Sequence, residues 1–314
     1  MDGISVTTLA ASNPLDHVVN HPFWWIEIGG QNWWIWSSHI GNLFLVGAIM
    51  LWLFPKLASM VATGPESLGS KRHLPRGTWA HVLEVMCIYL RDSVVRPLLG
   101  NQTEKYIHFL WTLFFFILLN NLLGLIPVLD IMLFSIKALA HFGVAPVEWV
   151  AQHRSPFGAT ATGNLWVNAC LAIITLLMYL VHGFRNLGPS GFAQHMTGGA
   201  PAMVWPIIIP IELASTFIIK PAALIIRLFA NMTAGHVLLA VMVMFIGLST
   251  TALPMIVSGP ISIASMGAMF AFYFLELLVA VLQAFIFMFL TTIFISQMSH
   301  HGHDEEHGHA AHAH

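Results

Sequence analysis

The sequence predicts an all-α integral membrane protein with about five transmembrane helices, the last two long, tilted and paired as a hairpin, plus an interfacial helix. Hydrophobic residues make up 57% of the 314-residue chain, and Asp, Glu, Lys and Arg only 8%. A soluble domain usually carries about 25% charged residues. Apolar residues also gather in segments that reach the length of about 20 residues needed to cross a bilayer. The net charge of −2 gives no basic footprint for a nucleic acid.

Five segments meet the length criterion for a span. They are expected at 39–61, 106–128, 164–184, 203–246 and 255–297. A helix of about 40 residues is about 60 Å long, twice the hydrocarbon thickness, and no turn cluster divides 212–246 or 261–297. We therefore favour two long tilted helices, joined near 248–254, over four short spans. The stretch 78–100 is apolar at helical spacing with scattered charges, which is typical of a helix at the membrane interface.

Lysine and arginine set the expected orientation, because cytoplasmic loops are enriched in these residues. Residues 1–55 contain none, and 56–105 contain seven of the chain's twelve. We therefore expect 1–38 outside as an external segment, 39–298 as a single membrane domain, and 299–314 as a His-rich cytoplasmic tail. The composition of the tail suits either weak metal binding or a solvated, disordered terminus.

A cluster of aromatic residues precedes the first span. It is expected to anchor the external segment at the membrane interface. Its members are Trp24, Trp25, Trp33, Trp34 and Trp36.

Arg227 lies inside the fourth span, where a charge costs roughly 2.5–3.5 kcal/mol on insertion scales. At about 100° per residue, Lys220, Asn231 and Glu212 fall within about 60° of Arg227 on the helix surface. His236 falls about 180° away, on the opposite side. The helix therefore has one polar face and a separate titratable group.

The fifth span carries Glu276 and Gln283, seven residues apart. If Gln283 lies level with Arg227 in an antiparallel pair, Glu276 lies roughly level with His236. Simpler interpretations remain for each group, such as a satisfied core histidine, an interhelical contact of the glutamine, a neutral acid, or an Arg227–Glu276 ion pair. Ionisable residues inside a membrane usually mark functional sites. Titratable groups off-centre, with a permanently charged arginine at the centre, are typical of a proton path interrupted by a positive barrier.

Four sequence motifs carry a resemblance to a known family. They are "NNLLGLIP" (120–127), "KPAALIIRLFANMTAGH" (220–236), "ELLVAVLQAFIFMFLTTIFI" (276–295) and, more weakly, "TGNLWVN" (162–168). Across about 80–130 and 160–298 the sequence resembles subunit a of the F-type ATP synthase.

The resemblance implies a role for each intramembrane polar residue. Arg227 matches the arginine that faces a ring of c subunits, and Gln283 the glutamine opposite it. Asn231 belongs to the same signature. His236 and Glu276 match a polar pair lining the outer half-channel, with acid and histidine exchanged relative to many bacterial members. The resemblance also places the final hairpin against the c-ring.

Glu212 resembles the acid of the inner half-channel, but with one difference in spacing. It precedes Lys220 by eight residues, where the family usually has seven. Either a one-residue bulge absorbs the difference, or Glu212 is not the equivalent residue.

The resemblance also implies a function and partners. We expect a proton-translocating stator subunit of a rotary ATP synthase, with two offset half-channels to the c-ring carboxylates and an arginine barrier between them. The expected partners are the c-subunit ring, the b subunits of the peripheral stalk, the rest of the complex and the lipid bilayer of a bacterial inner membrane. No catalytic residue, cofactor or metal is expected, since the sequence has no nucleotide loop of the GxxxxGK[ST] type.

Two other classes compete with this interpretation. A transporter of divalent metal would need several ligands at mid-membrane. Only His236 and Glu276 qualify, and Arg227 would repel a cation. A purely structural membrane anchor does not explain an intramembrane charge.

Overall fold

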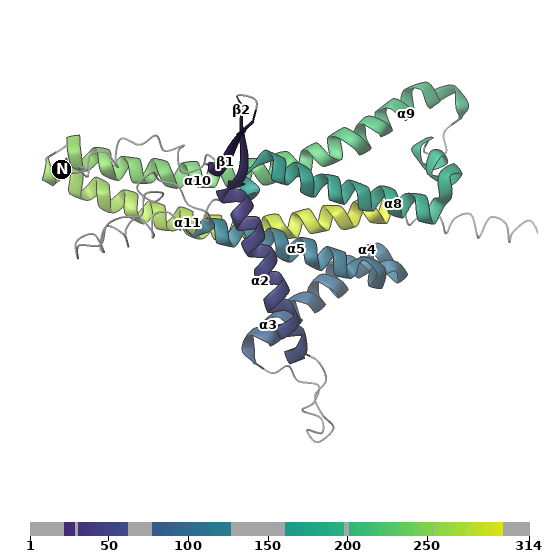
Figure 1. Cartoon of the computed structure of the whole chain (residues 1–314), viewed down its shortest axis with the longest axis horizontal. Helices are drawn as coiled ribbons and strands as arrows, with labels where there is room; N and C mark the ends of the chain where they lie inside the picture. Colours follow the sequence, from purple (N-terminus) through teal and green to yellow (C-terminus); the bar gives the residue numbers. More distant parts are fainter. Residues whose placement is uncertain are drawn as a thin grey trace, which may run out of the picture. The chain divides into compact units, whose positions relative to one another are not determined.

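A computed structural model describes residues 22–28, 31–61, 77–126, 161–197, 201–252 and 254–297. Apart from one short hairpin of strands, the elements in these residues are helices (Figure 1). Five helical stretches are long and apolar enough to cross a membrane. These are Ser38–Val61, Thr78–Leu125, Leu165–Gly188, Trp205–Thr250 and Met255–Gln297. The structure therefore confirms the predicted class.

The chain divides into two compact units, and five long helices contribute to both. Unit 1 comprises the described parts of Met1–Val46, Ile117–Val167 and Ile226–Gln283, and unit 2 those of Gly47–Phe116, Asn168–Ile225 and Ala284–His314. The shared helices are α2 (Ser38–Val61), α5 (Thr103–Leu125), α8 (Leu165–Thr197), of which only the first three residues belong to unit 1, α10 (Lys220–Ala252) and α11 (Met255–Gln297).

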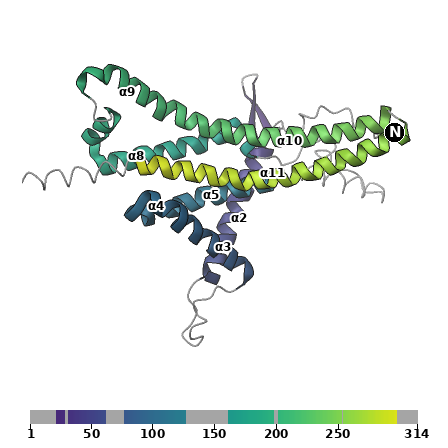
Figure 2. The ribbon, with the colours of Figure 1, turned by 180° about the vertical axis from the view of Figure 1, so that it is seen from behind.

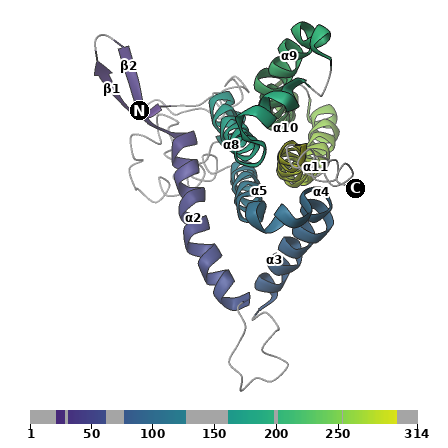
Figure 3. The ribbon, with the colours of Figure 1, turned by 90° about the vertical axis from the view of Figure 1, so that its right-hand side faces the viewer.

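In unit 1, an antiparallel hairpin of β1 (Pro22–Ile28) and β2 (Gln31–Ser37) comes directly before α2 (Figure 3). The tryptophans predicted only an aromatic anchor here, so the strands are an addition to the all-α prediction. Their signal is present in the sequence, because two runs rich in Trp and Ile are separated by Gly29 and Gly30. A two-residue Gly-Gly connection is typical of a tight β-hairpin.

The later part of α10 and the earlier part of α11 run side by side in opposite directions (Figures 1 and 2). The hydroxyl groups of Ser249 and Ser262 are hydrogen-bonded across this pair at 3.0 Å. The predicted hairpin is therefore confirmed, with its joint at the end of the expected stretch, because α10 continues to Ala252 and α11 begins at Met255. The tilt of these helices stays a prediction.

In unit 2, the expected interfacial helix 78–100 leads directly into the second span, with no loop between them. The stretch consists of α3 (Thr78–Tyr89), the π-helical η3 (Leu90–Val95), α4 (Arg96–Leu99), the 3-10 turn η4 (Gly100–Gln102) and α5. The helix is interrupted at Gly100, which has a positive φ of 53°. Glycine adopts this conformation readily because it has no Cβ. Helix α5 then begins at Thr103, three residues before the predicted start of the span.

Helix α8 (Leu165–Thr197) is longer than the span predicted at 164–184. Its apolar part ends near Gly188, where a φ of 68° kinks the helix. Hydropathy marks only the apolar part, so a polar continuation of the same helix was missed.

The fourth predicted span is one long helical stretch with a π-helical turn inside it. It consists of η6 (Ala202–Val204), α9 (Trp205–Ala214), η7 (Ser215–Ile219) and α10. The connector predicted at 129–161 lies outside the described residues up to residue 160, and η5 (Ala161–Gly163) follows it. The His-rich tail 299–314 also lies outside the described residues.

Candidate functional site

The imidazole of His236 and the carboxylate of Glu276 face each other between α10 and α11 in unit 1. The distance from Nδ1 of His236 to Oε1 of Glu276 is 3.8 Å, and the side chains are 22% and 5% exposed. This confirms the predicted pairing of the two groups on antiparallel helices. Among the acid–base combinations that the sequence identified, this pair is the most deeply buried. Proton exchange also requires the two groups to lie close together, as they do here.

Gly235 makes room for this pair. A Cβ at position 235 would lie 2.5 Å from Oε1 and 2.7 Å from Cδ of Glu276. The absent side chain therefore lets the carboxylate lie directly against α10. Sequence reasoning did not include Gly235 among the site residues, although the motif that ends in His236 contains it.

Arg227 lies on the exposed side of α10. Ala230 and Ala234, one and two turns further along, are also exposed, whereas Leu228 and Met232 on the adjoining side are buried. Within the part of the chain that the structure describes, no carboxylate lies within 4.0 Å of the guanidinium. The alternative in which Arg227 simply pairs with Glu276 is therefore not observed.

The contact between His236 and Glu276 also fixes where Gln283 lies along the hairpin relative to Arg227. Arg227 precedes His236 by nine residues, and residue 285 follows Glu276 by nine. In an antiparallel pair in contact at His236 and Glu276, Arg227 is thus level with a point two residues, or about 3 Å, from Gln283. Gln283 is 5% exposed, and among the described residues no hydrogen bond joins it to Arg227.

Asn231 lies between the exposed and the buried sides of α10. Its side chain is half-buried, and its Nδ2 is buried with no hydrogen-bond partner among the described residues. The structure therefore places Asn231 one turn from Arg227 on the same helix, but turned further towards the buried side.

A hydrogen-bonded clamp from α5 holds α11 between Glu276 and Gln283. Asn121 donates from Nδ2 to the carbonyl oxygen of Ala280 at 3.2 Å. Thr162 donates from its hydroxyl to Oδ1 of Asn121 at 2.7 Å. Both groups are buried, so satisfied hydrogen bonds of this kind fix the position of α11. The sequence motifs contained Asn121 and Thr162, but periodicity gave them no role.

Glu212 lies on α9 in unit 2, beside a second intramembrane cation. Its Oε1 accepts a hydrogen bond from Thr216 at 3.3 Å and lies 3.9 Å from Nζ of Lys220. The π-helical turn η7 falls between Glu212 and Lys220. A π-helical turn at this place agrees with the first of the two alternatives that the spacing of eight left open, a one-residue bulge.

Metal ligands do not converge in the described residues. No group of three or more His, Cys, Asp or Glu side chains there could hold a metal ion. The described residues bring a titratable base to a titratable acid at His236 and Glu276, and a cation to an acid at Lys220 and Glu212.

Comparison with known proteins assigns the family. The family model of the ATP synthase A chain matches residues 41–296. An ATP synthase subunit a from Chloroherpeton thalassium is 36% identical over 288 residues, covering 91% of this chain and 73% of that protein. One from Pelodictyon phaeoclathratiforme is 37% identical over 279 residues (88% and 69%), and one from Myxococcus xanthus is 34% identical over 267 (83% and 75%). The chain therefore belongs to the family of ATP synthase A chains, the subunits a of ATP synthases.

Proposed function

We propose that this chain is the non-catalytic, proton-translocating stator subunit of a rotary ATP synthase. The observation that carries the proposal is Arg227, an intramembrane cation exposed on α10 with no carboxylate near it among the described residues. A charge kept in that position needs a compensating partner. A carboxylate on another subunit that moves past α10 would supply it.

The outer half-channel would lead past His236 and Glu276. A proton passing along this pair is delivered to a carboxylate on a c subunit, which becomes neutral. The neutral acid can face lipid, whereas the ionised form could not without a large desolvation cost. The two groups are 3.8 Å apart, slightly beyond the hydrogen-bond reach of about 2.6–3.2 Å, so a small movement of either side chain would bring them into direct exchange.

Arg227 would form the barrier between the half-channels. Its guanidinium carries the positive charge of an arginine, so it repels a proton that moves directly across and attracts the carboxylate that has lost one. The exposed Ala230 and Ala234 support this role, because small side chains allow a partner helix to approach closely.

The inner half-channel would pass Glu212. A c-subunit carboxylate gives up its proton there and returns to Arg227 as an anion, and the ring advances by one subunit. Each proton contributes about 2.3 kcal/mol per 100 mV of membrane potential. Several must therefore be accumulated for each ATP, which is the purpose of rotation.

The partners and topology follow from the same proposal. The chain would contact the c-ring, the b subunits of the peripheral stalk and the rest of the complex in a bacterial inner membrane. Residues 1–38 would lie outside, 39–298 would form the membrane domain, and 299–314 would lie in the cytoplasm. The seven lysines and arginines of 56–105 support this orientation.

Replacement of Arg227 tests the proposal. An ion pair at about 4 Å and an effective dielectric of about 20 is worth about 4 kcal/mol, so Arg227→Ala should lower ATP-driven proton pumping by at least about a hundredfold. Pumping is measured in membrane vesicles that contain the assembled complex, with Arg185→Ala on α8, also exposed, as the matched control. Pumping at the normal rate by Arg227→Ala would rule out the barrier.

A further inference from the structure

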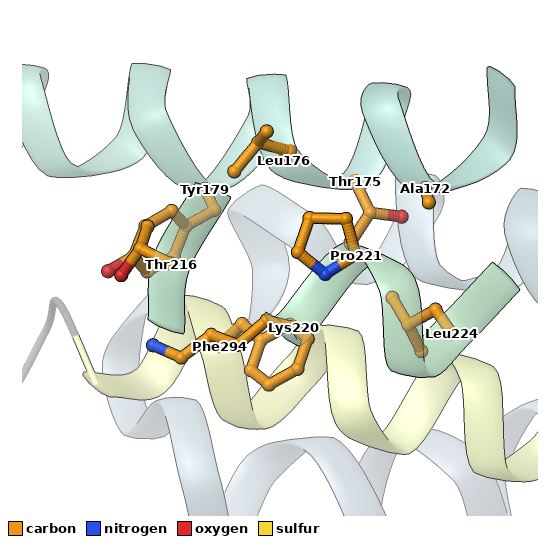
Figure 4. A pocket seen from close by; sticks show the side chains of 9 residues that line it. All are labelled: Ala172, Thr175, Leu176, Tyr179, Thr216, Lys220, Pro221, Leu224 and Phe294. Atoms are coloured by element: carbon orange, nitrogen blue, oxygen red, sulfur yellow. The ribbon is translucent and has the colours of Figure 1, made fainter. Parts of the chain in front are cut away.

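Lys220, at the start of α10, is held on several sides by groups of unit 2. Its Nζ donates a hydrogen bond to Oε1 of Gln297 at 3.1 Å. The same atom lies 5.3 Å from the ring centroid of Tyr179 and 5.6 Å from that of Phe294 (Figure 4). Aromatic faces attract a cation at this range. The ammonium group is thus fixed by α8 and α11 together.

The surroundings of the ammonium group are closely packed. The cavity beside it has a volume of about 10 Å³, enough for about one water molecule. The hydroxyl groups of Tyr179 and Thr216 lie next to each other at one end of it (Figure 4). The side chain of Lys220 is only 19% exposed. Its charge therefore has little freedom to move.

The π-helical turn brings Glu212 into reach of this fixed charge. In a regular α-helix, residues eight apart differ by about 80° around the axis, whereas residues seven apart differ by about 20°. The extra residue in η7 gives the pair the angular relation of a spacing of seven. The long side chain of Lys220 then lies back along the helix, with Nζ at 3.9 Å from Oε1 of Glu212.

Glu212 and Lys220 complement each other electrostatically. Among the described residues, Glu212 supplies the carboxylate within 4.0 Å of Nζ, while Tyr179, Phe294 and Gln297 contribute no opposite charge. Burying a cation without a compensating anion is costly. The carboxylate, 35% exposed, is in turn confined by Nζ and by the hydrogen bond from Thr216.

We propose that Lys220 is a positioning residue of the proton path, which holds the carboxylate of Glu212 where a c-subunit carboxyl group can exchange a proton with it. This inference rests on the proposed function and extends it to a residue of the polar face to which the family resemblance gave no role. Lys220 does not itself carry the proton. It acts through Glu212, and its own place is set by Tyr179, Phe294 and Gln297.

Two replacements separate the charge of Lys220 from its packing. Lys220→Met removes the positive charge but leaves an unbranched side chain of similar length. Lys220→Arg keeps the positive charge. Truncating one partner of a partly buried charge pair has a large effect, so ATP-driven pumping by the assembled complex should fall about tenfold or more in Lys220→Met. Lys220→Arg should restore most of it. Lys56→Met is the control, because Lys56 also lies over an aromatic ring, that of Trp52 at 5.0 Å, but is exposed.

A double-mutant cycle tests whether Lys220 acts through Glu212. If it does, Glu212→Gln combined with Lys220→Met should pump no less than the worse single variant. Three results would each overturn the inference. In the first, the losses caused by the two single substitutions multiply in the double variant. In the second, Lys220→Met pumps as well as the original chain, and in the third, Lys220→Arg pumps no better than Lys220→Met. If the complex with Lys220→Met does not assemble, Glu212→Asp serves as the test instead, because its shorter side chain moves the carboxylate away from Nζ of Lys220. Unchanged pumping by Glu212→Asp would also overturn the inference.

Arg227→Ala is measured in the same vesicles. If that variant pumps normally, the proposed function fails. If it is inactive while Lys220→Met is fully active, only the role of Lys220 fails.

Discussion

At the scale of single residues, the site depends on one acid, one base and one missing side chain. Glu276 is 5% exposed and has His236 at 3.8 Å, and Gly235 leaves the space in which the carboxylate lies. The arrangement of the site therefore depends on all three residues together. The exchange of acid and histidine between the two helices, which the family resemblance suggests, is chemically reasonable because an imidazole and a carboxyl group can each accept or donate a proton.

Exchanging His236 and Glu276 tests this symmetry. His236→Glu alone or Glu276→His alone leaves two like groups in contact, and loss of a positioned proton-transfer group costs about 10²–10⁴-fold in rate. We expect each single variant to lose pumping by about a hundredfold, and the double variant to recover at least about tenfold of it. Pumping is measured at equal amounts of assembled complex.

A second His–Glu pair provides the control for this exchange. His81 and Glu84 on α3 are also 3.8 Å apart but are 63% and 26% exposed. Exchanging them should leave pumping unchanged. A double variant of His236 and Glu276 that is as inactive as the worse single variant would show that the two positions do not substitute for each other.

At the scale of elements, η7 decides which residues of the fourth span share a face. It supplies one residue beyond the regular helix between Glu212 and Lys220. Its side chains Phe217, Ile218 and Ile219 are exposed and contribute little to the core. Apart from the buried Thr216, the turn therefore contributes angular register rather than packing.

Deletion of Ile218 should consequently be tolerated. The π-helical turn then becomes regular α-helix, Glu212 and Lys220 keep their common face at a spacing of seven, and most of the ATP-driven pumping should remain. Insertion of an alanine after Ile218 should instead separate the two side chains by about 80° and lower pumping about as much as Lys220→Met. Equal effects of the deletion and the insertion would contradict this role of the turn.

The elements also show what sequence can predict. Apolar length gave five spans, and α11 begins and ends at the predicted residues 255 and 297, because hydrophobicity coincides with helix there. Apolar length failed as a predictor where a helix continues into polar residues, as in α8 after residue 184. The intramembrane pair His236–Glu276 was predictable from helical spacing. The hydrogen bond from Asn121 to Ala280 was not, because it depends on how distant segments pack.

At the scale of the whole molecule, the described residues leave the charge of Arg227 without a neighbouring carboxylate. The described residues balance Lys220 with Glu212 and bring His236 to Glu276, but place no carboxylate beside Arg227. On the same side of α10, the exposed residues one and two turns after Arg227 are the small Ala230 and Ala234. Both features are expected of a surface against which another membrane subunit moves.

The purified complex should therefore retain a ring of small hairpin subunits, and a bulky side chain beside Arg227 should weaken that association. We expect Ala234→Trp to lower the amount of ring recovered with this chain after detergent extraction, because a large side chain prevents the close approach that small residues permit. Ala48→Trp on α2, also at an exposed alanine, is the control and should recover the ring fully. Full recovery with Ala234→Trp and loss with Ala48→Trp would place the ring against α2 instead of α10.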